Sequence, residues 1–376
     1  MRHYLDHAAT APLRPAAARA LADALGQVGN PSSLHASGRA ARRLLAEARE
    51  SVAADLGAAP PEVVFTSGGT EADNLALLGA AGEDGRLLVS AIEHPAVAGV
   101  RQRLPGRVDV LGVGADGYLD PAALAGSLVP GTAAGRGTAL VSVMWVNNET
   151  GAVQPVAELA RRCTAAGVLF HTDAVQAVGH LGVAFGEVGA DLLSVSAHKV
   201  GGPVGIGALL VRRGVALRPP GFGGGQEAGL RSGTVGVALA AGFAAALHEA
   251  VAELPTETTR LEGLRRVLLA GLLAVPGVEA SVAGPVSPAI AHVVVAGARA
   301  DDVLLLLDAA GIDCSTGSAC TAGVHQPSEV LLAMGRDAAA ASAALRFSFG
   351  PGSGPDAVAA VLAAFPEAVR RARLAA

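Results

Sequence analysis

Two short apolar runs, each ending in polar residues, lie within residues 168–199, which read VLFHTDAVQAVGHLGVAFGEVGADLLSVSAHK. The first run, 168–172, ends at Asp173, and the second, 191–196, ends at the Ser-Ala-His-Lys sequence of residues 196–199. Nearly continuous apolar runs of this length are typical of strands in a parallel sheet, which is buried on both faces. Because ligands of such sheets bind at the carboxyl ends of the strands, we expect a functional site where these two runs end.

The same alternation of strand-like and helical segments extends over the first two thirds of the chain. The other strand-like runs are residues 63–65, 87–90 and 139–146, and segments of helical length include 39–56 and 156–166. This βαβ pattern predicts right-handed crossovers and a mainly parallel sheet flanked by helices, so the fold class is α/β.

A second, smaller α+β unit follows a long Ala-rich helical region at residues 235–273. Its expected elements are a strand at 290–295, a helix at 301–310, a strand at 345–349 and a terminal helix. A chain of 376 residues suits one large and one smaller domain. We expect a large domain at residues 15–255 and a small domain formed by residues 1–14 and 256–376.

Composition and charge exclude several other classes of protein. The net charge of −5, without a basic run, argues against nucleic acid as a partner. The most apolar tract, residues 235–247, is shorter than the roughly 20 residues that a membrane span needs. Residues 1–6 are polar and show no leader peptide, so we expect a cytoplasmic protein. The three cysteines, Cys163, Cys314 and Cys320, are too few for a disulfide framework and are expected to be free thiols.

Lys199 is the only lysine among 28 basic side chains, so all the others are arginine. Covalent attachment of a carbonyl compound requires an amine that can lose its proton, which a guanidinium cannot do. The near-exclusive use of arginine for basic side chains therefore favours a chemical role for Lys199. The alternative is an ordinary surface lysine that escaped a compositional drift toward arginine.

Two further features are ambiguous when taken alone. Residues 66–71, Thr-Ser-Gly-Gly-Thr-Glu, follow a strand and open a helix, so they either bind an anion such as phosphate or form an ordinary capped turn. Asp173 either accepts a hydrogen bond from a protonated pyridine nitrogen or caps a helix. The glycine turn, Asp173 and then Ser-x-His-Lys, each at the end of a strand, are much more informative together.

Motifs along nearly the whole chain resemble those of the class V aminotransferase superfamily, which are fold-type I pyridoxal-phosphate enzymes, and within it the group I cysteine desulfurases. The motifs occupy residues 4–10, 30–35, 65–74, 93–94, 146–151, 171–176, 196–199, 231–234, 317–320 and 345–348. The resemblance implies a large domain with a mainly parallel sheet, a smaller α+β C-terminal domain, and pyridoxal 5'-phosphate as the cofactor.

By position, the resemblance also assigns roles in a cofactor site. It makes Lys199 the lysine that binds the cofactor covalently, Asp173 the partner of the pyridine nitrogen, and His94 the imidazole that stacks on the ring and acts as acid or base. A satisfied core histidine is the alternative for His94. The remaining contacts are to the ring hydroxyl (Gln176), to the phosphate (Gly69, Thr70, Ser196, His198 and, from the other subunit of a homodimer, Thr234) and to the substrate carboxylate (Asn148 and Arg346). No metal site is expected.

Cys320 decides which reaction is expected. It lies in a Gly/Ser segment, where a thiol is expected to be exposed and available for sulfur transfer, whereas Cys163 and Cys314 are expected in the core. The resemblance implies that L-cysteine becomes L-alanine and that Cys320 receives sulfur as a persulfide. An iron–sulfur scaffold or another sulfur-acceptor protein would then take the sulfur. The alternatives are a selenocysteine lyase, an aminotransferase of the same superfamily, and a non-enzymatic scaffold that kept the fold.

Overall fold

The structure is a computed structural model that describes residues 2–128, 137–317 and 326–375. In this described part, the central sheet has seven strands in the order β2-β8-β7-β6-β5-β3-β4. Only β8 runs antiparallel to its neighbours, so the predicted mainly parallel α/β sheet is confirmed. The strands are β2 (Val63–Thr66), β3 (Arg86–Ser90), β4 (Val108–Leu111), β5 (Thr138–Ser142), β6 (Leu169–Asp173), β7 (Leu192–Ser196) and β8 (Gly207–Val211).

The central strands are apolar throughout because both faces of the sheet are buried. Successive residues point to opposite faces, and in β3 Leu87 and Val89 pack into one hydrophobic cluster whereas Leu88 packs into another. In β8, Leu209 joins the first cluster and Leu210 joins the second. The continuous apolar runs in the sequence therefore follow from the two covered faces.

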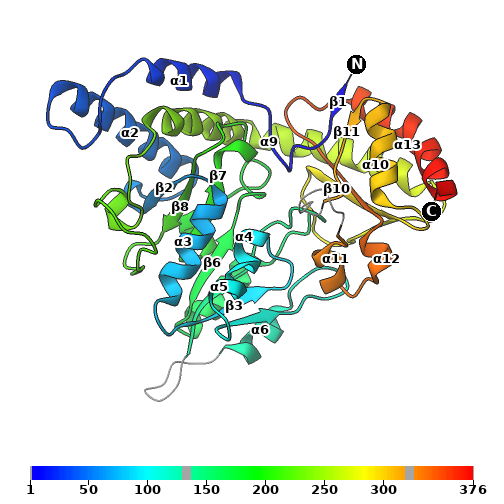
Figure 1. Ribbon diagram of the computed structural model, residues 1–376, viewed down its shortest axis with the longest axis horizontal. Helices are drawn as coiled ribbons and strands as arrows, with labels where there is room; N and C mark the ends of the chain where they lie inside the picture. Colours follow the sequence, from blue (N-terminus) through cyan, green and yellow to red (C-terminus); the bar gives the residue numbers. More distant parts are fainter. Residues whose placement is uncertain (1, 129–136, 318–325, 376) are drawn as a thin grey trace.

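Helices cover the two faces of the sheet (Figure 1). Helix α3 contributes to the cluster on one face, and α2, α7 and the first half of α9 contribute to the cluster on the other. The helices up to this point are α1 (Pro15–Leu25), α2 (Ala36–Asp55), α3 (Gly69–Ala81), α4 (Pro95–Ala98), α5 (Val100–Arg103), α6 (Pro121–Ser127), α7 (Val156–Ala165), α8 (Phe185–Val188) and α9 (Val237–Leu273), with short 3-10 turns η1 (Pro60–Glu62), η2 (Ala197–Lys199) and η3 (Glu227–Gly229).

The C-terminal part builds a separate antiparallel sheet with its own hydrophobic cluster. Its strand order is β12-β10-β9, and a parallel pair, β1 with β11, brings the N-terminal segment beside it. Both chain ends lie at this side of the molecule (Figure 1). Its elements are β1 (His3–Tyr4), β9 (Val278–Ala280), β10 (Ile290–Val295), α10 (Ala300–Ala309), β11 (Ile312–Asp313), α11 (Glu329–Ala333), α12 (Ala338–Ala341), β12 (Ala344–Ser348) and α13 (Pro355–Ala375).

Helix α9 connects the two parts. Its residues up to Ala250 belong to a core cluster of the central sheet, and those from Leu261 belong to the cluster of the C-terminal sheet. Pro255 lies inside the helix between them. The domain boundary at residue 255 stays a prediction. By length and composition α9 could cross a membrane, but a core helix passes the same test, and α9 packs along α1, α2 and α13.

One predicted strand is longer than the observed one. Residues 139–146 form a single apolar run, but β5 ends at Ser142. The chain beyond it remains hydrogen-bonded to the neighbouring strand, since the backbone N–H of Val143 donates to His171 and that of Trp145 donates to Asp173. This extension leads directly into the turn that carries Asn148.

Candidate active site

A cavity of about 390 Å³ lies at the carboxyl edge of the central sheet, where β6 and β7 end. This volume is in the range of small-molecule and cofactor sites. The predicted site residues that line it are Gly69, Thr70, His94, Asn148, Asp173, Gln176, Ser196, His198, Lys199 and Arg346. Residues from both parts of the fold therefore meet at the edge that the strand pattern indicates.

Lys199 ends the 3-10 turn η2 directly after β7, and its amine is held inside the cavity. Its Nζ donates hydrogen bonds to the carbonyl oxygens of Ala8 and Ala9, each at 2.7 Å. Burial and the nearby Arg346 lower the pKa of Lys199 to about 8, although Asp173 and Asp6 oppose this shift. The neutral, nucleophilic form of the amine is therefore accessible at mildly alkaline pH.

Asp173 ends β6 and is buried. Its Oδ1 accepts a hydrogen bond from the backbone N–H of Val175 at 2.8 Å, within the turn that follows the strand, where no helix begins. Burial raises the pKa of Asp173 to about 6, with the Val175 hydrogen bond and the charge of Lys199 acting in the opposite direction. A cationic N–H donor in the cavity would stabilise the ionised form of this carboxyl.

His94 caps the short helix α4 and presents a neutral imidazole to the cavity. Its Nδ1 accepts from the backbone N–H of Ala96 at 3.1 Å, so the proton of the neutral ring resides on Nε2. Burial, and then the charge of Lys199, lower the pKa of His94. Gln176 also lines the cavity, where its amide donates to the carbonyl oxygen of Ala8 at 2.8 Å.

The glycine turn before α3 forms a concave end of the cavity that suits an anion. A Cβ atom at Gly69 would lie 2.8 Å from Cγ2 of Val175, so only glycine fits at the first residue of this helix. The first backbone N–H groups of a helix have no partner within the helix and can bind an anion. Thr70, in the first turn of α3, and Ser196, at the end of β7, both line this end of the cavity. Burial lowers the pKa of His198 beside them to about 4, which keeps that imidazole neutral.

Arg346 on β12 brings a buried guanidinium from the C-terminal sheet. Its Nη1 donates to the carbonyl oxygen of Asn148, and its Nη2 donates to Oδ1 of Asp6, both at 2.7 Å. Its Nε has no hydrogen-bond partner among the described residues. Because a guanidinium carries five N–H groups, Arg346 keeps donors for an incoming carboxylate.

Four buried polar residues near this site have no predicted role, although two of them, Asp73 and His171, lie in the recognised motifs. A hydrogen-bond chain runs from Ser142 through His171 to Ser194, with N···O distances of 2.8 and 2.9 Å. Asp73 continues this chain toward the cavity, since its carboxyl accepts from Ser194 and its Oδ1 lies 3.6 Å from Nε2 of His171. Burial, and then the charge of Asp173, raise the pKa of Asp73. Its position one helical turn after Thr70 is the sequence signal for its place at the cavity.

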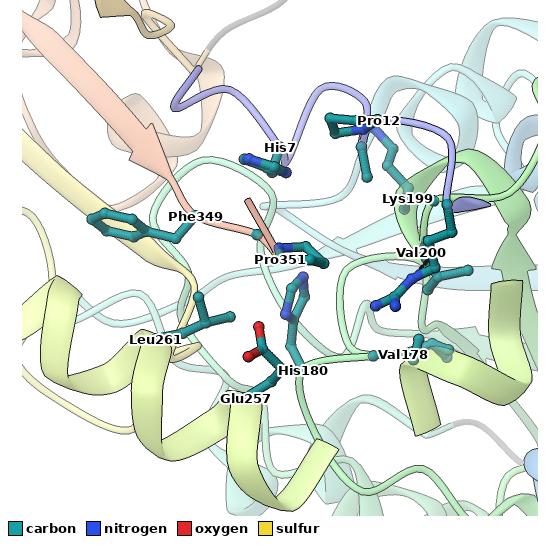
Figure 2. A pocket seen from close by; sticks show the side chains of 16 residues that line it. His7, Pro12, Val178, His180, Lys199, Val200, Glu257, Leu261, Phe349 and Pro351 are labelled. Carbon is teal, nitrogen blue, oxygen red and sulfur yellow. Dashed lines mark hydrogen bonds between the residues drawn. The ribbon is translucent and has the colours of Figure 1, made fainter. Parts of the chain in front are cut away.

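A much smaller cavity of about 30 Å³ lies on the other side of Lys199 (Figure 2). His7, His180 and Glu257 line it, from the N-terminal segment, the large part and helix α9, and His180 and Glu257 lie next to each other. The Nδ1 atoms of both histidines lack partners in the described structure. The volume holds one or two water molecules and excludes a cofactor.

Two predicted residues are not brought to the cavity. Thr234 is exposed and does not line the cavity of its own chain. Cys320 lies outside the described residues, whereas Gly317, three positions before it, lines the cavity. Cys163 is buried and Cys314 is half-buried against the C-terminal cluster, and burial raises the pKa of each thiol to about 12.

Comparisons with known proteins agree with this architecture. Residues 3–361 match the family Aminotransferase class-V. The chain is 47% identical over 388 aligned residues to the IscS-like cysteine desulfurase of Mycobacterium tuberculosis. The alignment covers 99% of this chain and 98% of that protein. It is 44% identical over 359 residues to a cysteine desulfurase of Gluconacetobacter diazotrophicus, covering 92% of this chain and 88% of that protein.

Solved structures show the same fold. A NifS-like protein from Rickettsia africae has a TM-score of 0.90 and 29% identity, covering 98% of this chain and all of that chain. The structure of SspA in complex with cysteine has a TM-score of 0.79 and 31% identity, covering 94% of this chain and all of that chain. The family match over residues 3–361 and the similarity to solved structures over nearly the whole chain lead to one conclusion: the chain belongs to the class-V aminotransferase family of fold-type I pyridoxal-phosphate enzymes.

Proposed function

We propose that this protein is a cysteine desulfurase that converts L-cysteine to L-alanine, with pyridoxal 5'-phosphate as its cofactor and Cys320 as the first sulfur acceptor. The observation that carries the proposal is the placement of Lys199, the only lysine, with its amine inside the cavity beside the buried Asp173. The relatives from Mycobacterium tuberculosis and Gluconacetobacter diazotrophicus bear the name cysteine desulfurase, and the SspA structure contains cysteine.

The cavity offers the groups that pyridoxal phosphate requires. Lys199 would hold the cofactor covalently, and Asp173 would accept a hydrogen bond from its protonated ring nitrogen. His94 would stack on the ring as a neutral imidazole. The glycine cradle supports a phosphate position at the N-terminus of α3, with contacts from Gly69, Thr70, Ser196 and His198, and with Gln176 and Asn148 near the ring.

When bound, pyridoxal phosphate supplies an electron-withdrawing ring that stabilises negative charge on the substrate Cα. The Arg346 guanidinium binds the substrate carboxylate, together with the Asn148 amide, through N–H donors that remain free in the cavity. The Lys199 amine, whose lowered pKa makes its neutral form available as a base, would remove the Cα proton. His94 carries a proton on Nε2 for exchange with the substrate sulfur or carbon.

The sulfur-transfer step balances without any outside oxidant. The Cys320 thiolate attacks the substrate sulfur, so that an S–S bond forms while the substrate Cβ–S bond breaks. The released electron pair and protons pass to the carbon skeleton. Cysteine and the Cys320 thiol thus become alanine and the Cys320 persulfide.

Two observations support Cys320 as the acceptor in preference to the other cysteines. The thiols of Cys163 and Cys314 have pKa values raised to about 12 by burial and are protonated at neutral pH. Gly317 lines the cavity, and three residues of chain span up to roughly 10 Å. Covalent connectivity therefore permits the Cys320 thiol to reach the substrate.

We also propose a homodimer in which Thr234 completes the phosphate site of the partner subunit. Thr234 is exposed and lies away from its own cavity, as a residue that serves a neighbouring subunit would. The persulfide sulfur would leave to an acceptor protein, such as an iron–sulfur scaffold.

The decisive experiment replaces Cys320 by alanine. Cys320→Ala should bind the cofactor with an unchanged visible spectrum, because the cofactor contacts lie elsewhere, yet it should form almost no alanine from cysteine. An added small thiol should restore part of the turnover, since it attacks the same sulfur. Cys163→Ser and Cys314→Ser serve as matched controls and should form alanine at the wild-type rate.

Mass spectrometry of wild-type protein treated with cysteine completes the test. The added sulfur should appear on the peptide that contains Cys320. Wild-type alanine formation by Cys320→Ala, or sulfur on Cys163 or Cys314, would overturn the assignment. Release of a keto acid in place of alanine would indicate an aminotransferase.

A further inference from the structure

Glu149 is a buried carboxyl in the turn that follows β5, and this turn is fixed rigidly to the large part. The side-chain oxygen of Asn147 accepts hydrogen bonds from the backbone N–H groups of Glu149 and Thr150 at 3.0 and 2.8 Å, and from the Thr150 hydroxyl at 3.0 Å. The Asn147 amide donates to the carbonyl oxygen of Ile92 at 2.9 Å. Glu149 also lines the cavity together with Lys199.

The carboxylate of Glu149 reaches the start of α11, shortly after the residues that follow Cys320 in the chain. The Ser328 hydroxyl donates to Oε2 of Glu149 at 2.5 Å, and both side chains are buried. The same hydroxyl caps α11 by accepting from the backbone N–H of Leu331 at 3.1 Å. Ser328 is further held by its backbone N–H, which donates to the carbonyl oxygen of Ala341 at 3.0 Å.

The aliphatic stem of Glu149 lies next to the space above Gly317, just before the same segment. Gly317 has a φ of +82°, and a Cβ atom there would lie 3.4 and 3.5 Å from Cβ and Cγ of Glu149 and 3.3 Å from Nε2 of His292. Gly317 is anchored in turn because its backbone N–H donates to the Ser315 hydroxyl at 3.0 Å. The Glu149 side chain is therefore hydrogen-bonded to the chain on one side of the segment that contains Cys320 and lies beside the chain on the other side.

We propose that Glu149 is a positioning residue for the sulfur-accepting thiol, because it ties Gly317 and Ser328 to the catalytic cavity and so fixes where the chain carrying Cys320 begins and ends. This inference rests on the proposed desulfurase function. Glu149 does not contact the reacting atoms in this proposal. It acts through Gly317 and Ser328, which lie on either side of the segment that contains Cys320. Burial raises the pKa of Glu149 while Ser328 and Arg346 oppose that shift, so the Ser328 hydroxyl is a stabilising partner of the ionised carboxylate.

The test is a double-variant cycle on the Glu149–Ser328 pair. Ser328→Ala and Glu149→Ala should each slow formation of the Cys320 persulfide in a single turnover about tenfold, the effect of one lost charge-assisted hydrogen bond. The double variant should be no slower than either single variant, because both remove the same contact. Ser328→Thr and Glu149→Gln keep a hydroxyl and an accepting oxygen and should recover most of the rate. Glu329→Gln, at the neighbouring exposed carboxylate, is the matched control.

A second measurement separates positioning from damage to the cofactor site. Exchange of the Cα proton of L-alanine with deuterated solvent requires Lys199 and the cofactor but no thiol acceptor. This exchange should stay within about twofold of wild type in Ser328→Ala, the range expected of a change outside the site. A parallel fall of Cα exchange and persulfide formation would overturn the proposal.

A third measurement needs no bound cofactor and no turnover. Backbone amide hydrogen exchange of the apo-protein should become faster in the peptide containing residues 147–151 when Ser328 is changed to alanine, but not when it is changed to threonine. Unchanged exchange in that peptide would show that the two ends are not tied. If wild-type protein formed no persulfide on Cys320, the proposed function would fail, and amide exchange would still decide whether the tie exists.

Discussion

Lys199 separates two cavities of very different size whose linings contain similar chemical groups. The cavity at the sheet edge holds about 390 Å³, and the one behind Lys199 holds about 30 Å³ (Figure 2). Each contains histidines whose pKa values are lowered by burial, such as the half-buried His198 in the larger and His180 in the smaller. A shifted pKa therefore does not distinguish a binding site from a small gap between packed segments in this protein. The volume of the cavity and the convergence of residues from the edge of the sheet make that distinction.

The largest expected effect is that of Lys199→Ala, which removes the group common to both cavities. The variant should lose all borohydride-stable attachment of pyridoxal phosphate and at least about a thousandfold in turnover, because one amine provides both the attachment and the base. No other lysine exists to replace it. Cofactor mass on tryptic peptides and alanine formation are the measurements.

The matched control for this prediction is Arg14→Lys. Arg14 lines the small cavity, so this change places a second lysine amine behind Lys199. The double variant Lys199→Ala, Arg14→Lys should remain unable to capture the cofactor, because about 30 Å³ cannot admit it. Covalent capture in the double variant would mean that the two cavities communicate.

A smaller effect is expected on the pH dependence of cofactor capture by the apo-protein. Only the deprotonated amine attacks a carbonyl, and the pKa of Lys199 is lowered to about 8. Capture should therefore increase with pH with a midpoint near 8, as followed by the visible absorbance after mixing. Arg346→Gln removes a nearby positive charge that lowers this pKa, so its midpoint should move to higher pH. A midpoint that moved down would contradict the assigned electrostatics.

The smallest effect is expected from His180→Gln in the small cavity. It should leave cofactor capture within about twofold of wild type. Burial lowers the pKa of His180 to about 4, so the unfolded chain binds a proton between about pH 6.5 and 4 that the folded chain does not. Wild-type stability should consequently fall as the pH decreases through this window.

Urea unfolding at pH 7 and pH 5 measures how much the free energy of unfolding changes between the two pH values in wild type and variant. Glutamine does not titrate, so the variant should lose between about 1 and 2 kcal/mol less stability than wild type over this range. His248→Gln, at an exposed histidine, is the surface control. An equal acid-induced loss in His180→Gln and wild type would show that the His180 ring gains its proton freely in the folded protein.

Much of the fold could be predicted because both faces of the central sheet are covered. The run at 168–172 becomes β6 and the run at 290–295 is β10 in full. Strand β8 was not among the strands expected from the sequence, and its direction could not have been predicted, because a continuous apolar run is identical in parallel and antiparallel strands. The end of β5 was also misplaced, since the apolar run continues over residues 143–146, which lie beyond the strand.

The candidate site was predictable to the extent that strand ends identify it. Asp173, Ser196 and Lys199 could be placed together because neighbouring parallel strands end at one edge. The contact between Glu149 and Ser328 joins residues 179 positions apart. The small cavity is lined by residues from three separate segments, among them His7, His180 and Glu257. No local pattern encodes such pairings, which depend on how the C-terminal part packs against the sheet.

Because the chain has a single lysine, cleavage by a lysine-specific protease can also report when the turn that contains Lys199 opens. An endoprotease that cleaves only after lysine has a single target in this chain, the bond between Lys199 and Val200. That bond lies at the end of a turn that is hydrogen-bonded within the interior, and the lysine side chain is tied to Ala8 and Ala9. The folded protein should therefore resist such a protease, and one cut should appear whenever the catalytic turn becomes accessible. The appearance of two fragments, residues 1–199 and 200–376, would report the local opening of this turn without any engineered label.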